Sequence, residues 1–113
     1  MTRIRITLAD LEVSAALNNS KTARLIAAAL PLESSAQRWG KEVYFSIPVA
    51  GGGEDPQADV PPGTVAYWPP GQALCLFFGQ TPYSPVNVVG QLGGDPQVLS
   101  VVKDGDPVRV ERT

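Results

Sequence analysis

Short segments of alternating apolar and polar residues, separated from one another by glycine and proline, constrain the fold of this chain more than any other feature. Residues 3–8 alternate in this way, and residues 11–17 do so again after a turn near Asp10. A period of two is typical of a half-buried strand. The two segments are therefore predicted to pair as an antiparallel hairpin.

Later parts of the chain repeat this pattern. A second hairpin is predicted around Gly40, and two strongly apolar runs are predicted to be neighbouring buried strands around a turn at residues 69–72. The strands expected after the first hairpin are residues 36–39, 42–49, 64–68, 73–78, 87–92 and a last strand at 108–111. Segment 50–63, rich in glycine, proline and acidic residues, is predicted to be an exposed, mobile loop.

Two segments indicate helices. Ser20 is a suitable N-cap, apolar residues follow at helical spacing and Pro31 ends the pattern, which predicts a main helix over residues 20–30. Asp95, followed by proline, is suited to begin a brief helix that extends to Val102.

This order of elements predicts a mainly β fold. The 113 residues suit one domain over residues 1–113, and a chain of this length can bury a core without disulfides. Eleven glycines and eleven prolines agree with many tight turns between short elements. We expect a small closed antiparallel β-barrel of about eight strands, with one main helix and one short helix.

Composition argues against several classes of function. Nine basic and eleven acidic residues give a net charge of -2 without a basic patch, which disfavours nucleic-acid binding. The absence of histidine removes the commonest general base and the commonest metal ligand, which excludes histidine zinc sites and serine or cysteine triads within this chain. We expect no cofactor and no metal site. The single cysteine and the lack of a secretory or membrane-spanning pattern indicate a cytoplasmic protein without a membrane partner.

Four strings of the sequence follow one another in an order that resembles cyclophilins, the peptidyl-prolyl isomerases. They are KTARLIAAAL at residues 21–30, FSIP at 45–48, GTVAYWPPGQALCLFFG at 63–79 and NVVG at 87–90. The longest string also resembles the pattern GxVxYWPPGxALxxFFG of short prokaryotic proteins with a cyclophilin-like fold and no established activity. The resemblance implies a cyclophilin-like barrel over essentially the whole chain.

The same resemblance implies that isomerase chemistry is missing. Phe45 stands where cyclophilins carry the catalytic arginine, and it has no donor to replace the guanidinium. Loss of one donor to a transition state typically lowers a rate on the order of a hundredfold to a thousandfold. Pro69 and Asn87 stand where the family has an asparagine and a histidine, and residues 82–86 lack its tryptophan. Only Phe78 matches a residue of the proline pocket.

The candidate ligand-binding residues are aromatic and polar side chains expected near the cyclophilin binding face: Arg38, Phe45, Tyr67, Trp68, Phe78, Gln80, Tyr83 and Asn87. An apolar pocket with a few polar groups is typical of ligand sites. The alternative is that most of these aromatic residues fill the barrel interior, since Tyr67 and Trp68 must face opposite sides of their strand. Arg38 either substitutes for the missing arginine or lies exposed and stacks on an aromatic ring.

Two further groups are expected to have no chemical role. Cys75 lies between two leucines and is expected to be a small buried apolar residue, because a nucleophilic cysteine needs a base. Glu54, Asp55 and Asp59 are expected to be solvated loop acids, since their spacing fits no EF-hand loop.

The sequence thus predicts a peptide- or small-molecule-binding module without isomerase activity. Three alternatives stay open: a weak or atypical isomerase, a structural oligomer, and a small enzyme or subunit of an amidohydrolase-type system. The last alternative follows from the resemblance, because domains of this fold also occur in such systems.

Overall fold

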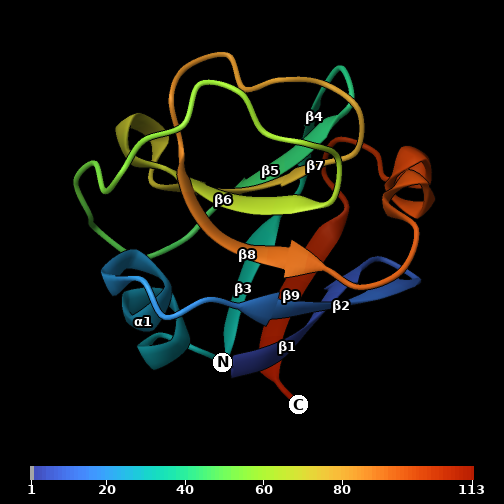
Figure 1. Ribbon diagram of the computed structural model, residues 1–113. Helices are drawn as coiled ribbons and strands as arrows, with labels where there is room; N and C mark the ends of the chain where they lie inside the picture. Colours follow the sequence, from blue (N-terminus) through green and yellow to red (C-terminus); the bar gives the residue numbers. More distant parts are fainter. Residues whose placement is uncertain (1) are drawn as a thin grey trace.

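The computed structural model describes residues 2–113, which form nine strands around an apolar interior (Figure 1). The strands are β1 (Thr2–Leu8), β2 (Leu11–Leu17), β3 (Leu32–Ser35), β4 (Gln37–Trp39), β5 (Glu42–Ser46), β6 (Thr64–Trp68), β7 (Ala73–Phe77), β8 (Asn87–Leu92) and β9 (Pro107–Arg112). All pairings are antiparallel, in the order β3-β9-β1-β2-β8-β6-β7-β5-β4. The prediction of a mainly β, antiparallel barrel is confirmed.

The predicted hairpins form the frame of this barrel. β1 and β2 pair from Thr2 opposite Leu17 to Leu8 opposite Leu11. β4 and β5 are joined through Gly40, whose φ of 58° lies in the left-handed region that glycine adopts without a steric penalty. β6 and β7 are joined by a short 3-10 turn, η1 (Pro69–Gly71).

Contact between the two ends of the sheet nearly closes the barrel. At this point the Ser34 hydroxyl of β3 donates a 2.7 Å hydrogen bond to the backbone oxygen of Ser46 in β5. β3 is the strand that the sequence pattern did not predict. It contains one apolar residue, Leu32, which is too little to show an alternation, and it is held in place by pairing with β9.

The two predicted helices are present. Helix α1 (Lys21–Ala28) lies at one end of the barrel, and the Ser20 side chain caps it by accepting a hydrogen bond from the backbone N–H of Ala23 (Figure 1). The second helix, η2 (Pro96–Val101), has 3-10 geometry and is capped by Asp95. Within residues 2–113, neither helix has the length and apolar character needed to cross a membrane.

Segment 50–63 is largely exposed, as predicted, but its middle is attached to the barrel. The Glu54 carboxylate accepts hydrogen bonds from the backbone N–H groups of Lys21 and Thr22, at 2.9 and 2.8 Å, and from the Thr22 hydroxyl at 2.7 Å. Such N–H groups in the first turn of a helix have no partner inside the helix. The hydrogen bonds from Thr22, and then that from Lys21, hold the pKa of Glu54 below its usual value. The expectation that Glu54 is only a solvated acid is therefore wrong.

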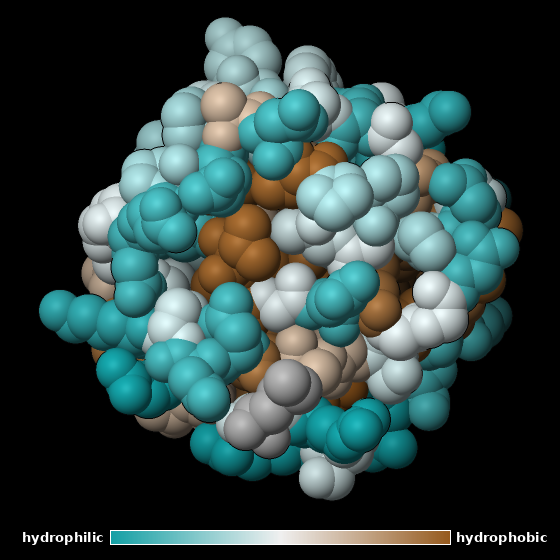
Figure 2. Space-filling view, viewed as in Figure 1, coloured by the Kyte–Doolittle hydropathy of each residue, from teal (hydrophilic) through white to brown (hydrophobic). Residues whose placement is uncertain are grey.

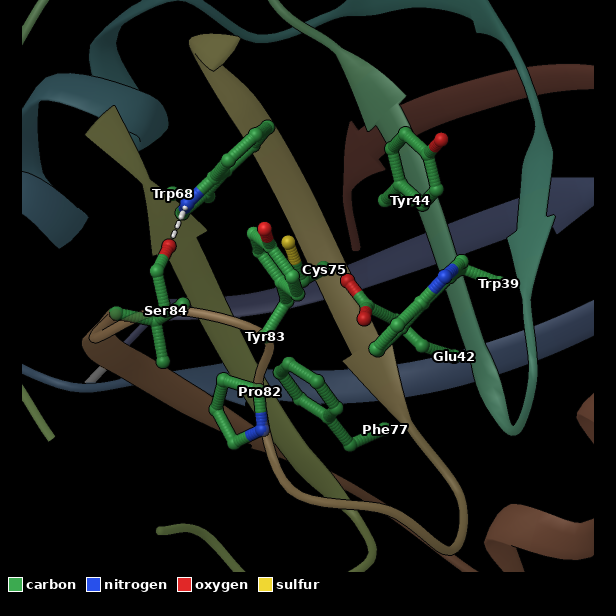
Figure 3. A pocket seen from close by; sticks show the side chains of 10 residues that line it. Trp39, Glu42, Tyr44, Trp68, Cys75, Phe77, Pro82, Tyr83 and Ser84 are labelled. Carbon is green, nitrogen blue, oxygen red and sulfur yellow. Dashed lines mark hydrogen bonds between the residues drawn. The ribbon is translucent and has the colours of Figure 1, made fainter. Parts of the chain in front are cut away.

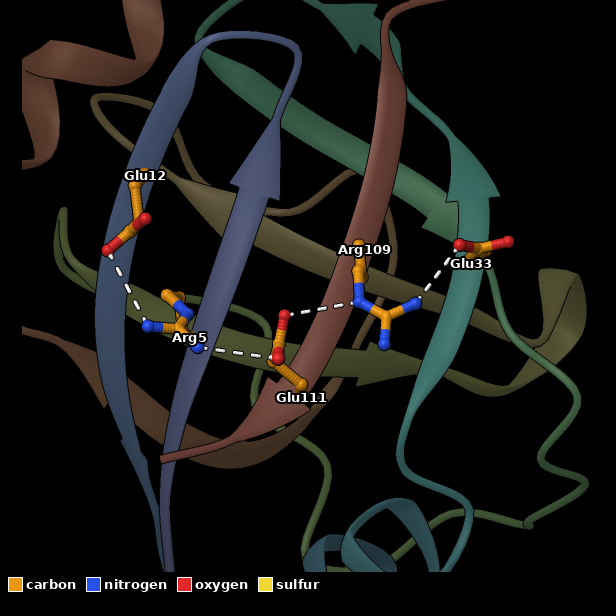
Figure 4. Close-up of polar contacts among 5 residues, drawn as sticks. All are labelled: Arg5, Glu12, Glu33, Arg109 and Glu111. Atoms are coloured by element: carbon orange, nitrogen blue, oxygen red, sulfur yellow. Dashed lines mark hydrogen bonds and ion pairs between the residues drawn. The ribbon is translucent and has the colours of Figure 1, made fainter.

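The outer surface of the barrel has two different faces. On β1, β2, β9 and β3, Arg5 bridges Glu12 and Glu111, and Arg109 bridges Glu111 and Glu33, with N–O distances of 3.1 to 4.0 Å (Figure 4). Exposed pairs of this kind contribute about 0 to 1 kcal/mol each, so they add little to the stability of the fold. Elsewhere on the surface, apolar side chains show in hollows between hydrophilic residues (Figure 2).

Candidate functional site

A second apolar cluster lies outside the barrel, on β6 and β7. Strand alternation produces it: Val65 and Tyr67 of β6 point into the barrel, so Ala66 and Trp68 point outward. The buried members of this outer cluster are Val60, Ala66, Cys75, Phe77 and Val86. Both faces of this part of the sheet are therefore apolar, and the chain beyond β7 covers the outer one.

A pocket of about 210 Å³ opens beside this cluster, under the segment that connects β7 to β8 (Figure 3). This outer pocket is lined by Trp39, Glu42, Tyr44, Trp68, Cys75, Phe77, Pro82, Tyr83, Ser84 and Val86. Five of these residues are aromatic, and both tryptophans of the chain are among them. Pockets for drug-sized ligands measure about 300 to 1,000 Å³, so this one suits a smaller molecule or a single side chain.

Aromatic contacts frame the mouth of the outer pocket. The rings of Trp39 and Tyr83 meet edge to face, with their centroids 5.7 Å apart. Both stay accessible, with exposed fractions of 48% and 80%. Across the pocket, the indole N–H of Trp68 donates a hydrogen bond to the Ser84 hydroxyl (Figure 3). The segment over the pocket is thus held by a polar contact on one side and an aromatic contact on the other.

Glu42 and Cys75 place polar groups deep in the outer pocket. The Glu42 side chain is only 7% exposed, and its carboxylate lies beside Cys75 (Figure 3). Burial raises the pKa of Glu42, and a hydrogen bond with the Cys75 thiol offsets that rise in part. Burial, followed by the nearby Glu42 carboxylate, raises the pKa of the Cys75 thiol well above its usual range. Cys75 is a buried free thiol and stays protonated, which makes it a poor nucleophile.

Two of the eight candidate residues from the sequence, Trp68 and Tyr83, line the outer pocket. Three others, Phe45, Tyr67 and Phe78, are buried in the interior cluster of the barrel. There the Tyr67 hydroxyl donates a 2.6 Å hydrogen bond to the backbone oxygen of Val49, close to where the loop after β5 begins. On β5 and β6, the interior Phe45 and Tyr67 thus lie on the opposite face of the sheet from Tyr44 and Trp68.

Asn87 is only 1% exposed and connects the 50–63 segment to α1. Its Oδ1 accepts a 2.8 Å hydrogen bond from the backbone N–H of Glu54. Its Nδ2 donates to the backbone oxygen of Gly52 at 2.9 Å and to the Thr22 hydroxyl oxygen at 3.2 Å. We call Asn87, Thr22 and Glu54 the loop anchor.

Arg38 and Gln80 make contacts within the chain at the edge of the barrel. The Arg38 guanidinium donates to the backbone oxygens of Gly40, Ser100 and Val102 at 2.8 to 3.3 Å, and it lies 5.0 Å from the centre of the Phe78 ring. Gln80 accepts a 2.8 Å hydrogen bond from the backbone N–H of Lys41, and neither Arg38 nor Gln80 lines the outer pocket.

Sequence reasoning missed most of the pocket lining, including Glu42, Tyr44 and Phe77. The signal for two of them is present in β5, where Val43 and Phe45 alternate with Glu42 and Tyr44. An inward Phe45 requires both alternate residues to face outward, on the same face of the sheet as Trp68. Within the part of the chain that the structure describes, no group of three or more acidic or cysteine side chains is placed to hold a metal ion.

Comparisons with known proteins agree with the barrel. The family model for cyclophilin-like proteins matches residues 2–111. The solution structure of the hypothetical protein AF2241 from Archaeoglobus fulgidus is similar, with 40% identity and a TM-score of 0.84 over 99% of this chain and 95% of that one. McbB, whose structure is in complex with tryptophan, is 22% identical with a TM-score of 0.80, and the match covers 97% of this chain and 44% of McbB. No curated protein matches the chain in sequence. The chain belongs to the cyclophilin-like family.

Proposed function

We propose that this protein is a binding module that takes an aromatic or apolar group, from a small molecule or a peptide side chain, into the outer pocket. The observation that carries the proposal is the gathering of five aromatic side chains around one open cavity of about 210 Å³. An apolar cavity with a few polar groups is the usual form of a ligand site. The tryptophan complex of McbB is consistent with an aromatic ligand on this fold.

Two features support a module without proline isomerase activity. Among the described residues that line the outer pocket there is no arginine, the side chain that cyclophilins use on the proline amide. Arg38, the nearest candidate in the sequence, already donates to three backbone oxygens and stacks on Phe78. An isomerase must lower the barrier of about 18 to 20 kcal/mol to rotation about the amide bond. The charged residue of the outer pocket, Glu42, cannot help in its ionised form, because it then has no hydrogen to donate to the proline amide.

A neutral aromatic fragment tests the binding proposal directly. Because Trp39 and Trp68 both line the outer pocket, the intrinsic tryptophan fluorescence of the protein reports on this site alone. Titration with 2-phenylethanol should change this fluorescence with a Kd on the order of 1 mM, from about 0.5 kcal/mol per non-hydrogen atom. Tyr83→Ala, at an exposed position, should weaken binding severalfold without affecting folding. Val101→Ala, at an exposed apolar position outside the pocket, is the matched control.

A protease-coupled isomerisation assay tests the other half of the proposal. The purified protein should leave the cis-to-trans rate of a proline peptide at its uncatalysed value. A rate near that of a cyclophilin would refute the proposal, and a weak activity that disappears in Arg38→Ala would identify Arg38 as a substitute for the missing arginine.

A further inference from the structure

The outer pocket contains one charged group, the Glu42 carboxylate, and it has no cationic partner in the described chain. The ion pairs among residues 2–113 involve Arg5 and Arg109, on the opposite face of the barrel. None of the residues that line the outer pocket is lysine or arginine. The titratable groups that face Glu42 from the neighbouring elements are the Cys75 thiol and the Tyr44 and Tyr83 phenols. An ionised Glu42 is thus accompanied only by neutral side chains.

This arrangement lowers the stability of the folded protein when no ligand is bound. Burying an ionised carboxylate without a cation is unfavourable, and the direction of the pKa shift of Glu42 agrees with that. A glutamine of the same shape would avoid the penalty. Because the fold provides no cation beside this buried acid, a bound ligand can supply the missing positive charge.

The aromatic walls favour the same kind of ligand. The face of an aromatic ring carries partial negative charge and attracts organic cations, and a ring of aromatic side chains is a common site for ammonium groups. Trp39, Tyr44, Trp68, Phe77 and Tyr83 surround the same cavity as Glu42. Carboxylate and rings therefore act with one sign: both attract a cation and both disfavour an anion.

We propose that the outer pocket binds a small organic ammonium ion with an aromatic body, whose charged nitrogen pairs with the Glu42 carboxylate while its body packs against the tryptophan and tyrosine rings. This inference rests on the proposed function, and it names the ligand class of that site. The cavity of about 210 Å³ holds a fragment-sized molecule, which favours a free amine over an extended peptide.

Three ligands of matched shape separate the charge from the packing. They are 2-phenylethylamine, which is cationic, 2-phenylethanol, which is neutral, and phenylacetate, which is anionic. Tryptophan fluorescence at neutral pH should give the order amine, alcohol, acid, with the amine binding about tenfold tighter than the alcohol, a difference of about 1.4 kcal/mol. Equal binding of amine and alcohol would overturn this inference and leave the proposed function intact, whereas no binding of any of the three would overturn both.

Glu42→Gln assigns the preference to one residue. In this variant the advantage of the amine over the alcohol should fall to the small part that the aromatic rings supply, and the alcohol itself should bind about as in the unchanged protein. Glu12→Gln is the matched control, because Glu12 is an exposed acid on the other face of the barrel. If Glu42→Gln retains the tenfold preference for the amine, Glu42 is not the partner and the inference is wrong. The ligand series in the unchanged protein decides the charge preference even if the variant folds poorly.

Two further readouts complete the test. The affinity for the amine should increase from acidic to neutral pH, because burial raises the pKa of Glu42 and only its ionised form pairs with the ammonium group, while the affinity for the alcohol stays flat. An amine affinity that does not change over this range would overturn the pairing with Glu42. Nα-acetyl-lysine methylamide offers the same ammonium group on a peptide-like stem. Tighter binding of this compound than of 2-phenylethylamine would overturn the assignment to a free aromatic amine.

Discussion

Replacing Asn87 with alanine should destabilise the whole protein while leaving the ligand pocket usable. Asn87 makes three hydrogen bonds at 2.8 to 3.2 Å, which connect β8 with Gly52, Glu54 and Thr22. All three are lost in Asn87→Ala. The change therefore removes one of the contacts that hold the 50–63 segment to the sheet and to α1, while the hydrogen bonds from α1 to the Glu54 carboxylate remain.

The size of the effect follows from these contacts. A hydrogen bond contributes about 1 kcal/mol net, so the three together amount to about 3 kcal/mol. Gly52 is exposed and its carbonyl can recover a bond to water, which lowers the expected loss to about 2 to 3 kcal/mol. At about 4 °C per kcal/mol for a domain of this length, the melting temperature should fall by about 10 °C. The protein should stay folded at room temperature, because such domains have about 5 to 15 kcal/mol of stability.

Thermal unfolding followed by circular dichroism measures this change, and limited proteolysis reports on the 50–63 segment, which should be cut faster in the variant. Asn19→Ala is the control, because Asn19 is exposed and precedes the same helix.

Asn87→Asp provides a second test. It removes both donated bonds and places a charge near Glu54, so it should destabilise more than alanine at neutral pH and less at acidic pH. An unchanged melting temperature in Asn87→Ala, together with lost binding of 2-phenylethanol, would refute the loop anchor and make Asn87 a ligand contact.

Three other outcomes are expected. Glu42→Gln should raise the stability of the protein at neutral pH. The folded-state pKa of Glu42 lies above 4.5, so its favourable contribution to the free energy of unfolding is full below that pH and is lost as the pH rises. Denaturation by urea at several pH values measures this change. Glu54→Gln should show the opposite trend, with a loss of stability that shrinks as acid protonates Glu54 in the unchanged protein, because its folded-state pKa lies below 4.5. Tyr67→Phe leaves the carbonyl of Val49 and the N–H of Gly51 without their partner and should lower stability by about 1 to 3 kcal/mol, as read from chemical denaturation.

The fold could be predicted from the sequence because most strands show their alternation directly. β1 and β2 alternate over seven residues each, and α1 has a cap at Ser20 and a stop at Pro31. β3 could not be found in this way, because its sequence LESS has one apolar residue and its position depends on pairing with β9, far along the chain. The attachment of segment 50–63 to the barrel could not be predicted for a related reason. Its attachment through Glu54 depends on Asn87 and on the start of α1, and no local pattern encodes such distant contacts.

The outer pocket was harder to predict, since both faces of β6 and β7 are apolar. In β7 all five residues, Ala73 to Phe77, are buried, so alternation in the sequence does not tell the barrel interior from the outer cluster. Of the five aromatic residues of the pocket only Trp68 and Tyr83 were among the candidates, and assigning the others to the same site required knowing which face of the sheet each occupies. Register supplies that knowledge: Glu42 of β5 pairs with Phe77 of β7, which places an acid next to an outward-facing aromatic residue.

Glu42 offers a way to separate selection for binding from selection for stability in this protein. If the carboxylate served the fold, its removal would lower the free energy of unfolding, as expected for an acid such as Glu54 that caps a helix. Desolvation predicts the reverse for Glu42, since its charged form has no cation beside it. A single variant, Glu42→Gln, should therefore make the protein more stable and at the same time less able to distinguish an ammonium ion from an alcohol. Only a residue retained for its ligand gives both results, because a structural acid would lose stability and an incidental surface acid would change neither quantity.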